Sequence, residues 1–285
     1  VKPLYYSLLK DKMFFSSEIK TFLKIPEFDK SINNQSIHNY LKFNYIPIPE
    51  TIFKNVWHVK PGTFLEIDLV SYEIVNNQYW EISNERETER TEEQTIDLME
   101  DALNEAIKIR LRSDVEIGAF LSGGLDSSLI CAMTMKNHKS ALNTFSIGFP
   151  EKRFDESEWA KKVADLYGLR NNTNILDADI IEYWNDTTWF NDQPHGDISF
   201  IPTYLLSEFA SKSYKVVFTG DGGDEFCGGY TKYFEFFKSK DHKDYFNQIS
   251  LIKDNSEFTN IYSDEFKNSV NLDIPFEIYS KCISE

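Results

Sequence analysis

The spacing of hydrophobic and polar residues differs between the first 80 residues and the rest of this chain. Up to residue 80, short apolar and aromatic runs alternate with turn residues. We predict strands over residues 3–9 and 12–16, a short helix from Ser17, and a β-hairpin region over residues 56–80 that contains a turn at Pro61–Gly62. This region is expected to be α+β and mainly antiparallel.

A polar stretch then interrupts the pattern. Residues 83–94 contain no large apolar side chain and mix charged with small polar groups, which is typical of a solvated connection. We place a linker there, so that residues 1–82 form one predicted domain and residues 95–285 form a second.

The second region opens with an amphipathic pattern. Ile96, Met99, Leu103 and Ile107 recur at spacings of three and four residues and predict a helix that packs along one face and ends near residue 111. The tail from residue 238 onward carries isolated aromatic residues compatible with helices, and it shows no recognisable chemistry.

Between these ends, strands and helices are predicted to alternate. Apolar runs predict strands over residues 115–121, 142–149 and 214–220, with helices over residues 126–138, 178–190 and 201–212, from residue 154 and after residue 229. Buried strands separated by helices indicate an α/β fold with a parallel sheet covered on both faces. Such sheets bind their ligands at the carboxyl ends of the strands.

Composition narrows the function classes. The chain has 285 residues, 41% of them hydrophobic and 15% aromatic, enough for one large core or two ordinary ones. A formal net charge of -16 disfavours nucleic acid as a partner. No apolar run approaches the roughly 18 residues of a membrane span, and no signal peptide opens the chain, so we expect a cytoplasmic protein without membrane contact.

The cysteines and the first residue add two further expectations. Cys131, Cys227 and Cys282 are odd in number and widely spaced, which indicates reduced thiols rather than a disulfide framework or a zinc site. The chain begins at Val1 in the middle of an apolar-aromatic pattern, so we expect it to be part of something longer.

The sharpest break in the apolar pattern is the sequence FLSGGLDSS at residues 120–128. It follows a predicted strand and opens a predicted helix, so its glycines would let backbone N–H groups approach an anion at a helix N-terminus. The lysine of the GxxxxGK[ST] phosphate loop is absent. Read alone, the segment is equally compatible with a simple tight turn.

Two other strand ends carry similar residues. TFSIGF, residues 144–149, places Ser146 and Gly148 where a flat purine could lie against exposed backbone. FTGDGGDEFCGGY, residues 218–230, ends a third strand with glycines and carboxylates, although an acidic turn would explain it when read alone. Three independent turns of this kind explain the pattern less well than one shared site does.

Taken in order, these segments resemble a known family. FLSGGLDSS, TFSIGF, FDES and FTGDGGDEFCGGY resemble the synthetase domain of glutamine-dependent asparagine synthetases, whose parallel sheet is of the ATP-pyrophosphatase (adenine nucleotide α-hydrolase-like) type. VKPLYYS, FSSEIKTFL and YIPIPETIFKNVWHVKPG resemble the C-terminal part of the family's glutaminase domain, an α+β N-terminal nucleophile hydrolase (glutamine amidotransferase type 2). The resemblance extends to about Tyr233.

The resemblance implies a reaction and its participants. ATP would activate the side chain of aspartate as an acyl-adenylate with release of pyrophosphate, and ammonia from glutamine would displace AMP to give asparagine. ATP and Mg²⁺ are the implied cofactors, aspartate and glutamine or ammonia are the implied substrates, and a homodimer is one state open to the full-length protein. Two alternatives stay open: amidation of another carboxylate, such as a polysaccharide precursor or a β-lactam precursor, and a nucleotide-binding remnant without activity.

The resemblance also assigns roles to residues. Asp126 and Asp224 would hold Mg²⁺, and Asp221, where relatives often carry glutamate, would be the catalytic residue facing the reacting centre. Ile147 and Gly148 would border the adenine. The implied ATP-binding set is Leu121, Ser122, Gly123, Gly124, Asp126, Ser127, Ser128, Ile147, Gly148, Thr219 and Gly220.

Other candidates receive plainer interpretations. The family's glutaminase uses an N-terminal cysteine that this chain does not reach, and we interpret Cys131 as a core residue rather than a substitute. None of the tail lysines matches the family's catalytic lysine. His195, Asp192 and Gln193 are interpreted as surface loop residues, and Asp155, three residues before Glu158, as a helix cap.

Overall fold

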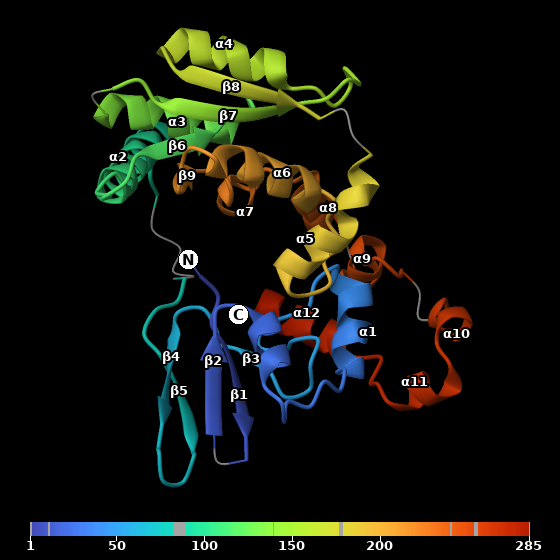
Figure 1. Ribbon diagram of the computed structural model, residues 1–285. Helices are drawn as coiled ribbons and strands as arrows, with labels where there is room; N and C mark the ends of the chain where they lie inside the picture. Colours follow the sequence, from blue (N-terminus) through green and yellow to red (C-terminus); the bar gives the residue numbers. More distant parts are fainter. Residues whose placement is uncertain are drawn as a thin grey trace. The chain divides into compact units, whose positions relative to one another are not determined.

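The computed structural model describes residues 2–10, 12–82, 89–138, 140–176, 179–239, 241–253 and 256–284 (Figure 1). The chain forms two compact units. Unit 1 contains Val1–Arg86, Asn185–Asp197 and Phe234–Glu285, and unit 2 contains Glu87–Trp184 and Ile198–Tyr233. Residues 83–88 of the predicted linker lie outside the described residues, and the domain limits drawn from the sequence stay a prediction.

Unit 1 begins with an antiparallel sheet in the order β2-β1-β3, in which Tyr6 pairs with Phe15 on one side and with Trp57 on the other. The predicted short helix is a 3-10 helix, η1 (Ile19–Lys24), and its Ile19 and Phe22 side chains are buried in the core of this unit. The strands of the sheet are β1 (Tyr5–Leu9), β2 (Lys12–Ser16) and β3 (Trp57–His58).

The predicted hairpin is formed by β4 (Thr63–Ile67) and β5 (Ile74–Gln78). Pro61–Gly62 does form a turn, but it precedes β4. The hairpin's own turn lies at residues 68–73, where the Asp68 carboxylate accepts hydrogen bonds from the backbone N–H groups of Val70 and Ser71 at 2.8 and 2.7 Å. A side chain that mimics a backbone turn therefore sets the register of this hairpin.

Helix α1 (Asn34–Phe43) was not predicted, because the face that it buries is polar. Asn33 caps it by accepting hydrogen bonds from the N–H groups of Gln35 and Ser36. The buried Lys42 donates a hydrogen bond from Nζ to Ile252 O at 2.9 Å, so this face packs on the tail. The tail is helical, as predicted, with α9 (His242–Ile249), α10 (Phe258–Ile261), α11 (Asp264–Asn268) and α12 (Ile274–Ser284).

His38 is a buried titratable residue in this packing. Its ring contacts Phe258 and Tyr262 with centroid distances of 4.8 and 5.9 Å, and its Nδ1 accepts a hydrogen bond from Tyr262 Oη at 2.9 Å. Burial raises the pKa of Tyr262 to about 12, so that hydroxyl keeps its proton. Burial also lowers the pKa of His38, an effect to which the nearby Lys42 charge adds.

This burial predicts a loss of stability in acid. Below pH about 6.5 the unfolded state binds a proton at His38 that the folded state does not, so the free energy of unfolding falls by up to about 1.4 kcal/mol per pH unit. Urea unfolding between pH 7.5 and 5.5 measures it. His38→Gln should show a shallower decline, and an unchanged slope in that variant would contradict the assignment.

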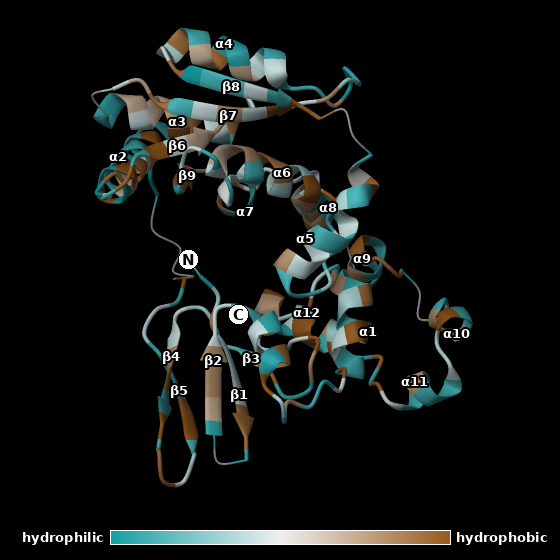
Figure 2. Ribbon diagram, in the orientation of Figure 1, coloured by the Kyte–Doolittle hydropathy of each residue, from teal (hydrophilic) through white to brown (hydrophobic). Residues whose placement is uncertain are grey.

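Unit 2 contains a four-stranded sheet in the order β8-β7-β6-β9. All three strand pairs are parallel, as predicted. The edge strand β8 was not predicted because its sequence, RNNTNI, is polar, and it is drawn mostly in the hydrophilic colour (Figure 2). The strands are β6 (Ile117–Phe120), β7 (Asn143–Gly148), β8 (Arg170–Ile175) and β9 (Val216–Phe218).

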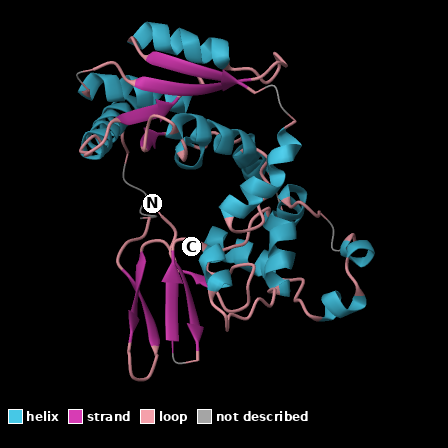
Figure 3. Ribbon diagram, viewed as in Figure 1, coloured by secondary structure: helices cyan, strands magenta, loops and turns pink. Residues whose placement is uncertain are grey.

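Helices cover both faces of this sheet (Figure 3). Phe145 of β7 contacts Phe209 of α6 (Phe200–Ser211) with a centroid distance of 5.5 Å. On the other face, Ala119 of β6 and Cys131 of α3 (Leu125–Asn137) share a buried cluster with Ala160 of α4 (Ser157–Tyr167). The sheet is therefore doubly wound.

Helix α2 (Glu92–Arg110) begins inside the predicted linker. Thr91 and Gln94 form a capping box, in which the Thr91 hydroxyl accepts from Gln94 N and the Gln94 side chain accepts from Thr91 N. Residues 92–94 are helical for this reason. The predicted apolar stripe packs only in its second half, since Ile107 is buried whereas Ile96 is 54% exposed.

The remaining helices follow the prediction in outline. The helix predicted over residues 178–190 is divided into η2 (Ile180–Tyr183) and α5 (Trp184–Asn191), and its predicted first residue lies outside the described residues. After β9 come α7 (Gly223–Cys227), where only a turn was expected, and α8 (Thr231–Lys238).

Candidate active site at the ends of the parallel strands

The order of the strands locates the candidate site. From β6 the chain moves through β7 to β8 on one side, and it then returns to place β9 on the other side of β6. Sheets of this kind bind their ligands outside the carboxyl ends of the strands where the winding direction reverses, here between β6 and β9. Residues 121–124 and 219–222, both singled out from the sequence, follow these two strands.

The loop after β6 is held by its own serines. Ser122 Oγ accepts a hydrogen bond from Gly124 N at 3.1 Å and lies 3.0 Å from Ser127 Oγ. Gly124, the N-cap of α3, offers no side chain to cap the first amides of the helix. Ser128 Oγ is buried without a hydrogen-bond partner among the described residues. Backbone N–H and hydroxyl groups without hydrogen-bond partners at a helix N-terminus are suited to bind a phosphate group.

Gly123 fixes this loop against α4. Its φ of +86° lies in the left-handed region, and an added Cβ would lie 2.5 Å from Ala160 N and 2.6 Å from Trp159 Cβ. No side chain fits between these backbones, so glycine is required both for its conformation and for its size.

The turn after β9 crosses the start of α3. A Cβ added to Gly220 would lie 2.7 Å from Ser127 N, and one added to Gly223 would lie 2.5 Å from Asp126 Cγ. The structure therefore brings Asp126 and Ser127 together with Gly220 and Gly223, as the prediction of a shared site requires. Thr219 is partly buried.

The other two predicted carboxylates lie near this contact. Asp221 is exposed in the turn before α7. Asp224 follows Gly223 directly, but its carboxylate lies against Gly229 at the far end of α7. The part of the chain that the structure describes contains no group of three or more His, Cys, Asp or Glu side chains placed to hold a metal ion. The metal roles of Asp126 and Asp224 stay predictions.

The expectation that the end of β7 offers exposed backbone to a purine is wrong. Ser146 and Gly148 are both buried and do not offer exposed backbone to a purine. Ile175 Cδ1 and Asp155 Oδ1 occupy the space beside Gly148, at 2.5 and 3.0 Å from where a Cβ would stand. Ile147 packs beside a cluster that includes Ile201. The roles of Ile147 and Gly148 beside adenine stay predictions.

Asp155 was predicted to cap α4, but the N-cap residue is Glu156, and Asp155 lies one residue before it and closes the end of β7. Its Oδ1 accepts hydrogen bonds from Ser157 N at 3.1 Å and Phe149 N at 3.3 Å, and its Oδ2 accepts one from Ser157 Oγ at 3.0 Å. The hydrogen bond from the Ser157 hydroxyl, followed by that from the Ser157 amide, lowers the pKa of Asp155. The carboxylate therefore joins the loop after β7 to the helix after it.

The sequence did not reveal a polar cluster inside the sheet. Ser146 Oγ donates a hydrogen bond to Leu121 O at 2.6 Å, which fixes the residue that begins the phosphate-type loop. The Asn171 side chain lies 2.9 Å from both Ser146 Oγ and Thr144 Oγ1. A serine and a threonine two residues apart on a buried strand were the available signal, since both side chains point to the same face.

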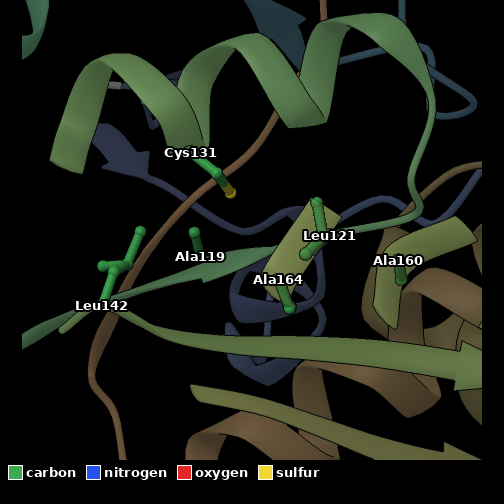
Figure 4. Close-up of a cluster of buried hydrophobic side chains, with 6 residues drawn as sticks. All are labelled: Ala119, Leu121, Cys131, Leu142, Ala160 and Ala164. Carbon is green, nitrogen blue, oxygen red and sulfur yellow. The ribbon is translucent and has the colours of Figure 1, made fainter. Parts of the chain in front are cut away.

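Cys131 is a core residue, as the sequence indicated (Figure 4). Its side chain is buried beside Ala119 and Leu142, and burial raises the pKa of the thiol to about 12. A thiol in this state is neither accessible nor ionised at neutral pH, so it is unsuited to be a nucleophile.

This burial gives a simple prediction for thiol labelling. At pH 8 a thiol reagent such as Ellman's reagent should react rapidly with the exposed Cys227 and Cys282 and with Cys131 only after denaturation. A double variant with serine at the two exposed positions is the control and should show no rapid phase. A rapid third thiol in the native chain would contradict the burial of Cys131.

A doubly wound parallel sheet with glycine-rich turns at its switch point defines this half of the molecule as an α/β protein of the class whose ligands bind at the carboxyl ends of the strands. Comparison with known sequences identifies the family. The "Asparagine synthase" profile matches residues 98–272, and the "Glutamine amidotransferase domain" profile matches residues 1–80. The chain belongs to the asparagine synthase family.

Individual relatives agree with this assignment. A putative glutamine-hydrolysing asparagine synthetase 2 of Methanocaldococcus jannaschii is 34% identical over all of this chain and 57% of its own length. Glutamine-hydrolysing asparagine synthetase 1 of Bacillus subtilis is 34% identical over 82% of this chain and 37% of its own. The chain thus spans about half or less of these relatives.

More distant matches differ in name. Amidase chry2 of Gibberella zeae is 29% identical over 81% of this chain and 36% of its own length. Among solved structures, a glutamine-dependent NAD+ synthetase from Acinetobacter baumannii matches 74% of this chain and 39% of its own, with 17% identity and a TM-score of 0.36. That score is too low to equate the two folds.

No helix within the described ranges combines the length and the apolar character that a membrane span needs.

Proposed function

We propose that the full-length protein makes asparagine from aspartate by ATP-dependent amidation, with nitrogen from glutamine. The observation that carries this proposal is the convergence of two glycine-rich turns on the start of α3, where Gly220 lies beside Ser127 and Gly223 beside Asp126. Membership of the asparagine synthase family supports ATP-dependent amide formation as the reaction class.

The proposed reaction has two steps. A carboxylate oxygen of aspartate attacks the α-phosphorus of ATP, and pyrophosphate leaves with the electrons of the broken P–O bond. The nitrogen of ammonia then attacks the acyl carbon, AMP leaves, and the new amide nitrogen loses a proton. Hydrolysis of glutamine to glutamate supplies the ammonia.

The loop after β6 would stabilise the leaving pyrophosphate. Ser122, Ser127 and Ser128 offer hydroxyl donors, and the first amides of α3 offer backbone donors, so the negative charge that develops meets groups already in place. Ser128 Oγ is an available donor, because it has no hydrogen-bond partner among the described residues.

Of the two carboxylates predicted to hold Mg²⁺, Asp126 lies where it could bind the ion and Asp224 does not. The ion takes one or two carboxylates and completes its shell with phosphate and water, and when bound it would offset negative charge on the phosphates. Asp126 lies at the crossing of the two turns and fits this role. Asp224 would have to rotate away from Gly229 to join it. Asp221 is proposed to face the carboxylate substrate from the turn after β9.

A second candidate keeps the chemistry and changes the acceptor. The similarity to a protein named as an amidase means that matched proteins do not all carry the name asparagine synthetase, so amide formation on a different carboxylate is the second candidate. Both candidates use the residues assigned to ATP in the same way, because activation of either carboxylate releases pyrophosphate.

The test measures pyrophosphate released by the full-length protein with ammonium or glutamine. Aspartate is compared with glutamate, a sugar acid and a β-amino acid, and the nucleotide products are separated. AMP and pyrophosphate that appear only with aspartate would support the main proposal. The same products with another carboxylate would select the second candidate, ADP and phosphate would overturn both, and ATP binding without any turnover would indicate a non-catalytic remnant.

A further inference from the structure

Ser146 is a buried serine of β7 to which the proposed function gives no role. The residue is 2% exposed, and its Oγ donates a hydrogen bond to Leu121 O at 2.6 Å. Leu121 directly follows β6 and is itself 1% exposed, so its carbonyl is sheltered from water. Removal of the serine hydroxyl would take this donor away from a buried acceptor, which is costly.

The peptide group between Leu121 and Ser122 is held on both of its sides. Because a peptide group is planar and trans, its C=O and N–H point in opposite directions and turn together. The C=O accepts the hydrogen bond from Ser146, and the N–H of Ser122 donates one to Ser127 Oγ at 3.3 Å. Ser127 Oγ also lies 3.0 Å from Ser122 Oγ and donates to Gly124 O at 3.3 Å. The direction of one peptide group therefore connects Ser146, inside the sheet, with two hydroxyls of the loop.

The neighbouring Asn171 indicates which acceptor receives the Ser146 proton. A hydroxyl carries one proton, and two acceptors lie within its reach, Leu121 O at 2.6 Å and Asn171 Oδ1 at 2.9 Å. Thr144 Oγ1 also donates to Asn171 Oδ1, at 2.9 Å. Since Leu121 O is the closer acceptor and Asn171 has Thr144 as a second donor, the Ser146 proton serves Leu121.

We propose that Ser146 is a positioning residue for the loop after β6. Its hydroxyl sets the direction of the peptide group between Leu121 and Ser122, and this group sets the places of the Ser122 and Ser127 hydroxyls. The inference rests on the proposed function, in which these hydroxyls stabilise the leaving pyrophosphate. Donors that are in place when charge develops need no reorganisation at that moment, so a loop without this anchor should still bind ATP but react more slowly.

The first experiment tests the anchor without nucleotide, in the 285-residue chain. Thr144→Val is the matched control for Ser146→Ala, because each removes a buried hydroxyl beside Asn171 and, of these two described residues, only Ser146 is bonded to Leu121. Both variants should unfold at a lower urea concentration than the wild type. Hydrogen exchange of the peptide that begins at Leu121 should become at least about fivefold faster in Ser146→Ala and change less than about twofold in Thr144→Val. Equal exchange rates in the two variants would overturn the anchor.

Ser146→Cys keeps this test decisive if the alanine variant does not fold. Cysteine has nearly the same shape as serine and is a weaker donor, so exchange of the same peptide should be at least about twofold faster than in the wild type. Exchange at the wild-type rate in a folded Ser146→Cys variant would overturn the anchor.

The second experiment measures pyrophosphate release by the full-length protein at varied ATP, with saturating aspartate and ammonium. For Ser146→Ala we expect kcat to fall at least about fivefold, while the KM for ATP changes less than about twofold. Thr144→Val should leave both parameters within about twofold of the wild type. Equal losses of kcat in the two variants would indicate a role in stability alone, and a raised KM with unchanged kcat would indicate a role in substrate binding. Either result would overturn the proposal.

The two experiments separate this inference from the function on which it rests. A wild-type protein that releases no pyrophosphate with any carboxylate would refute the proposed function and the catalytic consequence of the anchor, while hydrogen exchange would still decide whether Ser146 holds the loop. An active wild type together with an unchanged kcat in Ser146→Ala would refute this inference alone.

Discussion

Replacing Gly123 by alanine is expected to reduce pyrophosphate release by the full-length protein at least about a hundredfold, which corresponds to about 2.7 kcal/mol of barrier. Alanine would have to adopt a φ of +86° and place its Cβ 2.5 Å from Ala160 N. The loop must move away from α4, and the hydroxyl and amide donors of Ser122 and Gly124 move with it. The added strain and crowding should also lower the free energy of unfolding by about 2–4 kcal/mol.

Gly168 provides a matched control for this substitution. Its φ of +67° imposes the same conformational cost on alanine, but nothing lies within 4 Å of an added Cβ. Gly168→Ala should therefore cost about 1 kcal/mol of stability and leave activity unchanged. Steady-state pyrophosphate release and urea unfolding of both variants decide the matter. Activity of Gly123→Ala within about threefold of the wild type would contradict the assignment of the loop.

Asp126→Asn is expected to lower turnover by at least about a hundredfold at saturating Mg²⁺, or roughly 2.7 kcal/mol of barrier. The substitution keeps the shape of the side chain beside Gly223 and removes its charge. Stability should change by less than about 1 kcal/mol, because the carboxylate contributes only a favourable charge in the first turn of α3. We expect the same loss for Asp224→Asn, provided that the Asp224 carboxylate turns toward Asp126 when nucleotide binds.

Asp114→Asn serves as the control for the loss of one negative charge, since Asp114 is exposed and lies before β6. Pyrophosphate release is measured as a function of Mg²⁺ concentration in all the variants. A loss confined to Asp126→Asn would remove Asp224 from the proposed site. Wild-type turnover in both variants would leave the proposed metal role without support.

The sequence predicted those elements whose apolar residues pack on the rest of the fold. The strands β6, β7 and β9 were found because each is a short apolar run. The edge strand β8 was missed because its asparagines form hydrogen bonds with β7 rather than an apolar surface. Helix α1 was missed for a related reason, since its buried face is polar and gains partners only when the tail packs on it.

The sequence predicted one part of the candidate site, the meeting of two turns, but not the burial of Gly148. The meeting of the turns after β6 and β9 follows from a general rule about strand ends, so two sequence motifs were enough to place it. The burial of Gly148 was not predictable, because Ile175 and Asp155 cover it from other segments. Asp192 was misread as a surface loop residue for the same reason, since its side chain is 7% exposed and its partners Ile19 and Lys20 are distant in the sequence.

The position of β9 at the edge of the sheet affects the order in which the chain folds. Strand β6 pairs with β7 through Ala119 and Thr144, but with β9 through Ile117 and Val216, which closes a loop roughly four times longer and costs about 1 kcal/mol more in entropy. A nascent chain that ends before Val216 therefore exposes an unpaired edge of β6, the kind of edge at which aggregation begins. Its loop after β6 has no partner turn, so nucleotide affinity should arise late in synthesis, when β9 emerges from the ribosome.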